Sequence, residues 1–269
     1  MQNPFSVVIS VYKNDNAKYF YDALNSIIQQ SVVPSEIVIV VDGPVGNDIS
    51  TVLALYSSDP RVRIIKLVDN LGLGAARHIA VQACKNELIT VMDADDIAVP
   101  ERFALQLKEF EANNVDVVGG QIEEFTSVPG DLNRFRRVPL SDFDIKKRNR
   151  WRQAINHVSI MFKRDAYLRA GGYRSLAKVE DWDLTHRMIV SGSNFKNIPK
   201  TLVHVRSNDE QFHRRQGLAY LKEELHLFRE MRASGYINDL QFMINCSIRC
   251  FSRLLPARFL VLVYKLLLR

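Results

Sequence analysis

Between residues 5 and 96, short hydrophobic runs alternate with amphipathic stretches. The runs are rich in Val and Ile, as in strands buried on both faces, and they cover residues 5–12, 36–43, 62–69 and 87–96. The intervening stretches carry apolar residues at helical spacing and cover residues 14–30, 49–58 and 72–85. Strands that alternate with helices form parallel sheets with helices on both faces. The pattern therefore predicts an α/β fold with a mostly parallel, Rossmann-like central sheet.

The rest of the chain continues this pattern less regularly. It predicts a helix over 100–112, a strand over 115–125, a strand and short helix over 157–173, a helix over 179–192, and mostly helix over 213–252. The segment 127–150 is polar and basic and contains Pro and Gly, so we expect a mobile loop there.

Polar side chains follow the predicted strands. Asp42, Asn70 and the acidic cluster Asp93, Asp95 and Asp96 all lie at carboxyl ends. Ligands of open parallel sheets bind at this edge, so we expect these side chains to line one crevice.

The acidic cluster indicates a metal site. One Asp would suffice to cap the helix that starts near Pro100, and three are too many for that role. Carboxylates one residue apart at a strand end provide hard oxygen ligands for Mg²⁺ or Mn²⁺, which substrate phosphates usually share. We therefore expect a divalent cation, Mn²⁺ or Mg²⁺. Asp42 has a simpler alternative role as a turn former before Gly43.

The stretch "GLGAAR" lacks the third glycine of a dinucleotide-binding fingerprint. Its position favours a helix that begins close to a ligand, with Arg77 one turn in and available for a phosphate or ribose.

Composition narrows the class of partner. A net charge of +6 over 269 residues favours anionic ligands. The basic residues are not interleaved with aromatic residues in a recognised module, so we expect no nucleic-acid binding. Three cysteines, Cys84, Cys246 and Cys250, include no CxxC pair and indicate reduced thiols in a cytosolic protein. No stretch reaches the ~20 apolar residues that span a bilayer.

Five motifs occur together in order: "SVVISVY", "EIVIVVDG", "NLGLGAAR", "MDADDI" and "EDWDL". In this order and spacing the chain resembles family 2 glycosyltransferases of the bacterial O-antigen and exopolysaccharide type, over about residues 5–205. The resemblance implies a GT-A fold and inverting sugar transfer from a nucleotide sugar. It implies a catalytic domain over 1–205, with a nucleotide-sugar half to about 98 and an acceptor half from about 99. A helical region follows over 206–269.

The resemblance also implies roles for individual residues. Asp42 would hold the base of a UDP-type donor, Asp93 the ribose, and Asp95, with Asp96, the metal on the diphosphate. The complete donor-binding set is Val11, Tyr12, Asp42, Asn70, Arg77, Asp93, Ala94, Arg214 and Arg215. The metal set is Asp95, Asp96 and His204. The family often has an Arg two positions before this His, whereas here His204 opens the stretch "HVR" and the order is reversed. Arg214 and Arg215 could alternatively be surface charges.

Inverting transfer needs a carboxylate that takes the proton of the acceptor hydroxyl. Asp181 is the expected base, with Glu180 as its neighbour or substitute; helix capping is the alternative role for one of these acids. We expect Trp182 and His157 on the acceptor side, with Trp182 either stacking on a sugar or packing in the core.

The expected reaction transfers a hexose, from UDP-Gal or UDP-Glc for example, to a saccharide on undecaprenyl diphosphate. A non-catalytic sugar-binding protein of the same fold is one alternative. A phosphatase with a DxD motif is another, although that motif belongs on the first strand of such enzymes.

The last segment, 256–269, combines a wide apolar arc with a narrow basic stripe of Arg258, Lys265 and Arg269. A helix of this kind lies in an anionic membrane interface, and a terminal helix packed on the core is the alternative. We therefore expect a cytoplasmic protein that is peripheral on the inner face of the cytoplasmic membrane.

Overall fold

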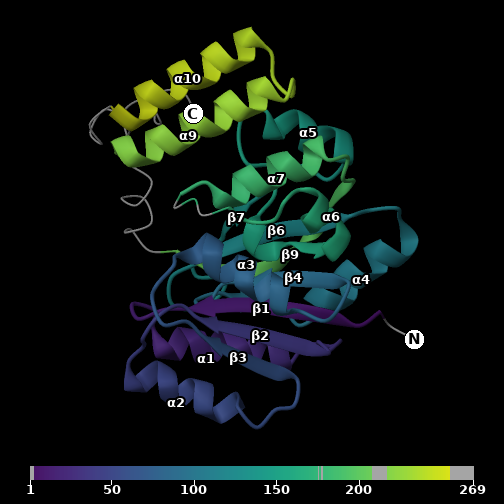
Figure 1. Cartoon of the computed structure of the whole chain (residues 1–269). Coiled ribbons are helices and arrows are strands. Elements are labelled where there is room, and N and C mark those ends of the chain that lie inside the picture. The colour runs from purple at the N-terminus through teal and green to yellow at the C-terminus, as the bar shows by residue number, and fades with distance from the viewer. Residues whose placement is uncertain (1–2, 175, 177, 208–216, 255–269) are drawn as a thin grey trace. The chain divides into compact units, whose positions relative to one another are not determined.

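The computed structural model describes residues 3–174, 176, 178–207 and 217–254 (Figure 1). Contacts within the chain divide it into two compact units, Met1–Ser207 and Asn208–Arg269. The predicted donor residues Arg214 and Arg215 and the predicted membrane helix 256–269 lie outside the described residues.

A nine-stranded sheet forms the centre of the first unit. Its strands are β1 (Phe5–Val11), β2 (Glu36–Val41), β3 (Val62–Lys66), β4 (Leu88–Met92), β5 (Ile97–Ala98), β6 (Val117–Phe125), β7 (Arg134–Arg136), β8 (Met161–Lys163) and β9 (Phe195–Arg206). The order is β3-β2-β1-β4-β8-β6-β9-β5, and β7 pairs with β6. β1 to β4 are parallel to one another, as is β9 to β6, whereas β8 runs antiparallel to β4 and β6. The predicted α/β fold with a mostly parallel sheet is confirmed.

Helices cover both faces of the parallel half. The first unit contains α1 (Ala17–Ile28), α2 (Asn47–Tyr56), α3 (Leu73–Ala83), α4 (Arg102–Ala112), α5 (Asp142–Asn149), the 3₁₀ turn η1 (His157–Ser159), α6 (Arg164–Arg169) and α7 (Glu180–Val190). α1 begins because Asn16 accepts hydrogen bonds from Lys18 N at 2.9 Å and Tyr19 N at 3.2 Å. Its apolar face packs with alternate residues of β1 and β2 in the main core, whereas α3 packs on these strands outside that cluster.

The segment 127–150 is not the mobile loop that the sequence indicated, because it contains β7 and α5. β7 pairs with the end of β6, and Ser141 caps α5 by accepting a hydrogen bond from Asp144 N at 3.2 Å. Acids in the first turn of α5 and cations in its last turn complement the helix dipole. Local charge placement and one strand pairing therefore order a segment with few apolar residues.

The sequence also gave no indication that β9 is one of the longest strands. Its pairing with β6 shifts register around Gln121, so that Ile198 pairs with Gly120 and Thr201 with Gln121. This irregularity leaves Pro199 and Lys200 outside the ladder, which explains why a strand tolerates a proline here.

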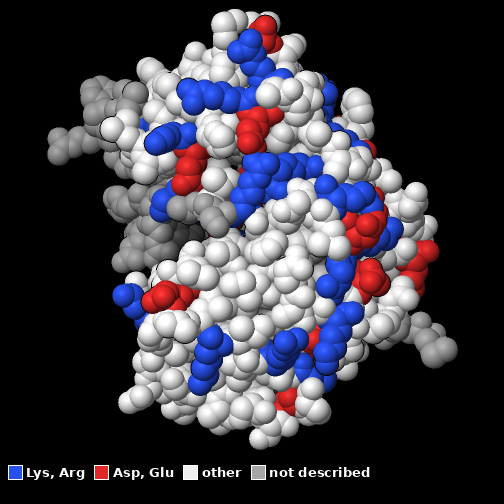
Figure 2. All heavy atoms as spheres, viewed as in Figure 1, with Lys and Arg blue, Asp and Glu red and all other residues white. Residues whose placement is uncertain are grey.

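The second unit contains α9 (Leu218–Ala233) and α10 (Asp239–Leu254), which pack against each other. The buried Glu224 of α9 forms ion pairs with Arg249 at 3.4 Å and Arg253 at 3.0 Å on α10. Among the described residues, no helix has both the length and the apolar character to cross a membrane. On the face of the protein shown in Figure 2, Lys and Arg outnumber Asp and Glu, in keeping with the net charge of +6.

Candidate active site

The turn after β2 joins two of the predicted donor residues. The Asp42 carboxylate accepts hydrogen bonds from Leu71 N at 2.7 Å and Gly72 N at 3.0 Å. Asn70 Nδ2 donates to both the backbone oxygen and Oδ2 of Asp42, each at 3.0 Å. Gly43 allows this approach: it has a φ of 83°, and a Cβ on it would lie 2.8 Å from Asn70 N. Asp42 thereby fixes the chain that leads into α3.

The end of β1 lies beside this turn. The backbone oxygen of Val11 accepts a hydrogen bond from Asp42 N at 2.8 Å, and Tyr12 N donates to Asp15 Oδ2 at 2.9 Å. Four of the predicted donor residues, from the ends of β1 and β2 and the start of α3, are therefore neighbours in space.

Arg77 connects two further acidic elements. Its side chain, on α3, is only 6% exposed; Nη2 lies 2.5 Å from Asp93 Oδ1 and Nη1 lies 3.4 Å from Glu180 Oε1. Burial lowers the pKa of Arg77, but the charge of Asp93 and other neighbouring groups raises it further, so the pKa lies above its ordinary value. A permanent buried cation therefore joins the end of β4 to the start of α7.

The acidic cluster after β4 concentrates negative charge. Asp96 is buried, and its Oδ1 accepts a hydrogen bond from Arg206 N at 2.8 Å. Burial, followed by the charges of Asp95 and Asp93, raises the pKa of Asp96 well above its ordinary value. The cluster is therefore electrostatically strained in a way that a bound cation would relieve.

The residues present fit a metal site in which substrate phosphates supply the remaining ligands. Within the described residues, no group of three or more His, Cys, Asp or Glu side chains converges as a full ligand set. His204, on β9, has Nδ1 2.9 Å from Glu123 Oε2 on β6. Mg²⁺ is usually held by one or two carboxylates together with substrate phosphates, so a full protein set is not required. The partly exposed Asp95, next to the buried Asp96, satisfies that smaller requirement.

Arg206, which the sequence analysis did not identify, holds the acidic cluster in place. Besides its backbone bond to Asp96, its Nε donates to the backbone oxygen of Asp95 at 3.2 Å. The guanidinium lies 3.7 Å from the ring centroid of Tyr19 and 4.5 Å from that of Phe125. Arg206 therefore ties the end of β9 to the acidic cluster from between two aromatic rings.

A second arginine, Arg102, lies fully buried beneath the end of β4. Its Nη2 donates to Thr90 Oγ1 at 2.9 Å and to Val91 O at 2.8 Å. Burial lowers the pKa of Arg102 to about 9, although the charges of Asp93 and Asp96 act in the opposite direction. This cation offsets part of the repulsion within the cluster.

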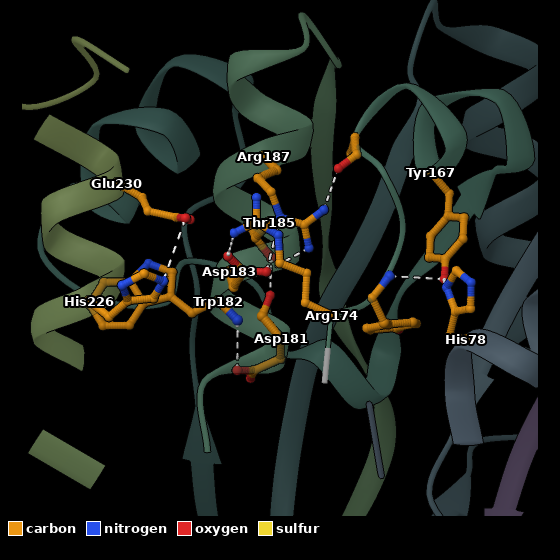
Figure 3. A network of polar contacts seen from close by, with 12 residues as sticks. His78, Tyr167, Arg174, Asp181, Trp182, Asp183, Thr185, Arg187, His226 and Glu230 are labelled. Atoms are coloured by element: carbon orange, nitrogen blue, oxygen red, sulfur yellow. Dashed lines mark hydrogen bonds and ion pairs between the residues drawn. The ribbon is translucent and has the colours of Figure 1, made fainter. Parts of the chain in front are cut away.

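The first turn of α7 presents the acidic pair. Glu180 is buried, and burial together with the charge of Asp181 raises its pKa to about 7. Asp181 is more exposed, and its Oδ1 accepts a hydrogen bond from Trp182 N at 2.7 Å (Figure 3). Further along, Asp183 forms an ion pair with Arg187 at 2.6 Å, which anchors this turn.

Trp182 and His157, the predicted acceptor-side residues, are both buried. Trp182 Nε1 donates to Asn149 O at 3.1 Å, so the indole packs against the end of α5. His157 Nε2 lies 2.7 Å from the Tyr173 hydroxyl. Burial, followed by the charge of Arg77, lowers the pKa of His157 to about 3, so its imidazole is neutral at physiological pH.

Comparison with known proteins places this chain in a family. The model of the family described as "Glycosyl transferase family 2" matches residues 6–169. The "UDP-Gal:alpha-D-GlcNAc-diphosphoundecaprenol beta-1,3-galactosyltransferase" of Escherichia coli is 33% identical over 98% of this chain and 96% of its own. The "Amylovoran biosynthesis glycosyltransferase AmsE" of Erwinia amylovora is 31% identical over 97% and 98%.

Solved structures show the same fold at low sequence identity. TarS 1-349 of S. aureus, crystallised with UDP-GlcNAc, superposes with a TM-score of 0.71 at 16% identity, over 93% of this chain and 73% of TarS 1-349. A longer TarS chain has a TM-score of 0.69, and the match covers 44% of its length. These structures share the curled, mostly parallel sheet flanked by helices. The chain belongs to glycosyl transferase family 2 and has its GT-A fold.

Proposed function

We propose that the protein transfers a hexose, with inversion, from a UDP-sugar to a saccharide carried on a lipid diphosphate during synthesis of a bacterial surface polysaccharide. The activity in the name of the E. coli relative, which aligns over nearly its full length, supports both the donor and the acceptor class. The amylovoran relative and an O-antigen biosynthesis glycosyltransferase of E. coli, 28% identical, support the polysaccharide setting.

In this proposal the donor binds along the ends of β1, β2 and β4. Asp42 and Asn70 hold the base, Arg77 and Asp93 the ribose, and the backbone around Val11, Tyr12 and Ala94 borders the nucleotide. Arg214 and Arg215, which were also predicted to bind the donor, lie outside the described residues. The partly exposed carboxylates of Asp93 and Asp95 support an anionic pocket that takes a cation together with a phosphate group.

Asp95, with Asp96 and His204, would hold Mn²⁺ or Mg²⁺. The bound cation would neutralise the negative charge that grows on the departing diphosphate.

On the acceptor side, Asp181 acts as general base. Its carboxylate takes the proton of the acceptor hydroxyl while that oxygen bonds to the anomeric carbon. The bond from the anomeric carbon to the diphosphate oxygen breaks, and its electron pair leaves with UDP. Glu180 holds Arg77 in position beside the base. The buried Trp182 and His157 pack behind the acceptor side of the site.

The observation that carries this proposal is the contact of Arg77 with both Asp93 and Glu180. It brings a donor-side acid and the acidic pair of α7 to one buried cation, although Arg77 and Glu180 are 103 positions apart in sequence. A phosphatase with a DxD motif would carry it on the first strand, whereas here β1 to β3 precede the acids.

The proposal includes peripheral attachment to the inner face of the cytoplasmic membrane, where a lipid-linked acceptor would be met. The basic and apolar pattern of residues 256–269 supports this location.

The test is a transfer assay with the purified full-length chain. A panel of UDP-sugars, including UDP-Gal and UDP-Glc, is offered with a short-chain polyprenyl diphosphate saccharide in Mn²⁺ or in EDTA. Mass spectrometry should find a product one hexose heavier in Mn²⁺ and none in EDTA. Absence of product with every donor would favour the non-catalytic alternative, and release of phosphate from a monoester would favour the phosphatase.

A further inference from the structure

The segment between β7 and α7 carries far more positive than negative charge. Residues 134–152 hold eight Arg and Lys side chains and two acids, Asp142 and Asp144. One acid pairs with a lysine of the same segment, Asp142 with Lys146 at 2.8 Å, and Asp144 accepts a hydrogen bond from Ser141 Oγ at 2.6 Å. With two acids against eight cations, the acids of the segment leave most of its positive charge unbalanced.

Three of these cations, Arg136, Arg148 and Arg152, belong to two stretches of the chain that are hydrogen-bonded to each other. Arg148 Nη1 donates to Arg137 O at 3.4 Å, which places it at the end of β7, and Arg152 N donates to Arg148 O at 3.1 Å within one turn. Burial lowers the pKa of Arg148, and the charges of Arg152 and Arg136 lower it further. We call these three residues the arginine cluster.

Arg148 has an unused donor. Its Nε is buried and has no hydrogen-bond partner among the described residues. Among the residues that the structure describes, no carboxylate forms an ion pair with Arg148. Repulsion among like charges and a buried donor without an acceptor both cost stability, and an anion bound at this place would relieve both.

The arginine cluster lies beside the proposed base. Asn149, next to Arg148, accepts the hydrogen bond from Trp182 Nε1 at 3.1 Å. Gln153, next to Arg152, donates to Thr185 Oγ1 at 3.2 Å, and Thr185 Oγ1 donates to the backbone oxygen of Asp181 at 2.8 Å. The segment that carries the cluster is therefore packed on the first turn of α7, on the acceptor side of the site.

We infer that Arg136, Arg148 and Arg152 bind the diphosphate of the lipid-linked acceptor, an inference that rests on the proposed function. Guanidinium groups form bidentate hydrogen bonds with phosphate oxygens, which suits two linked phosphates better than a single carboxylate. In the proposed function the donor's diphosphate lies with the cation at Asp95 and Asp96 after β4, so the arginine cluster would serve the second substrate. Anchoring the diphosphate beside α7 would present the adjoining sugar hydroxyl to Asp181.

Equilibrium binding tests the site without requiring turnover. The probe is a fluorescent short-chain polyprenyl diphosphate GlcNAc, measured with saturating UDP and Mn²⁺ so that the donor pocket is filled. A phosphate-free alkyl GlcNAc glycoside is the matched ligand. Arg148→Gln and the more exposed Arg152→Gln are compared with Lys108→Gln, which removes an exposed charge on α4.

Both arginine variants should bind the diphosphate probe about tenfold more weakly, because each loses charge-assisted hydrogen bonds. Binding of the glycoside and of UDP should not change, and the Lys108 variant should match the wild type. The same variants should bind acceptor-free anionic vesicles with wild-type affinity. Weaker vesicle binding would instead assign the arginine cluster to a lipid headgroup.

Unchanged affinity for the diphosphate probe in both variants would overturn the site, as would an equal loss for probe and glycoside. Weaker UDP binding alone would assign the cluster to the donor. A wild-type protein that binds the probe but transfers no sugar would contradict the proposed function and leave this site in place.

Discussion

The Nη2 atom of Arg77 lies 2.5 Å from Oδ1 of Asp93, in a pair whose arginine is almost fully buried. Replacing Arg77 by Met should leave both Asp93 and Glu180 without their cation. Because Asp93 is about one-third exposed and therefore screened, we expect a loss of roughly 2–3 kcal/mol in the free energy of unfolding. Urea unfolding measures this, with Arg63→Met on the exposed side of β3 as control. Equal losses in the two variants would show that the bridge does not stabilise the fold.

The raised pKa of Glu180 predicts the direction of a pH effect on stability. Its carboxyl binds a proton more tightly in the folded chain, with a pKa of about 7, than at its ordinary value of 4.5. The folded state is therefore favoured by protonation, and the free energy of unfolding contributed by this group should fall as the pH rises from about 4.5 to about 7. Above that range the contribution is constant. Glu180→Gln should flatten this slope in denaturant titrations; an unchanged slope would assign it to another group.

Arg206 should control the affinity for the metal without contacting it. Arg206→Met removes the bond to the Asp95 backbone and the packing between Tyr19 and Phe125. Loss of such supporting contacts typically weakens metal binding about 10- to 100-fold, so half-saturation by Mn²⁺ should shift by that amount. Excess Mn²⁺ should restore turnover, which a purely structural defect would not allow. A variant that keeps the wild-type Mn²⁺ dependence would refute this role.

Asp42 should control affinity for the nucleotide. Asp42→Ala removes the acceptor that fixes Leu71 N and Gly72 N, so the chain entering α3 loses its anchor. We expect the dissociation constant for UDP to rise about tenfold, as for the loss of a charge-assisted hydrogen bond. Asp59→Ala, which removes a carboxylate paired with Arg61 in the turn before β3, is the control. Calorimetry with UDP gives both constants, and equal affinities would remove Asp42 from the donor pocket.

The parallel half of the fold follows from local patterns. β1, β2 and β4 are continuous Val- and Ile-rich runs because both faces of each strand are covered. β9 could not be predicted in this way, since Pro199 interrupts it and its partner β6 lies far away in the chain. α5 was missed because charge placement and a serine cap, rather than an apolar face, define it.

The same distinction applies to the site. The positions of Asp42, Asn70 and Asp93 after strand ends could be predicted, because the strand ends of a parallel sheet share one edge. Arg206 was not identifiable, because it donates to Asp96 Oδ1 and to the backbone oxygen of Asp95, about 110 positions earlier in the chain. Arg102 was not identifiable either, since nothing in a helical stretch indicates that its guanidinium points beneath a strand end. Contacts with backbone atoms of distant residues produce no motif that could be recognised in the sequence.

The central claim is that Asp181 takes the proton of the acceptor hydroxyl during sugar transfer. Single-turnover kinetics of Asp181→Asn, with the UDP-sugar and the lipid-diphosphate acceptor both saturating, test it most directly. The rate of transfer should fall about 10²- to 10⁴-fold, while the affinity for UDP stays at the wild-type value. A variant that transfers sugar within a few fold of the wild-type rate, or that loses UDP affinity instead, would contradict the account.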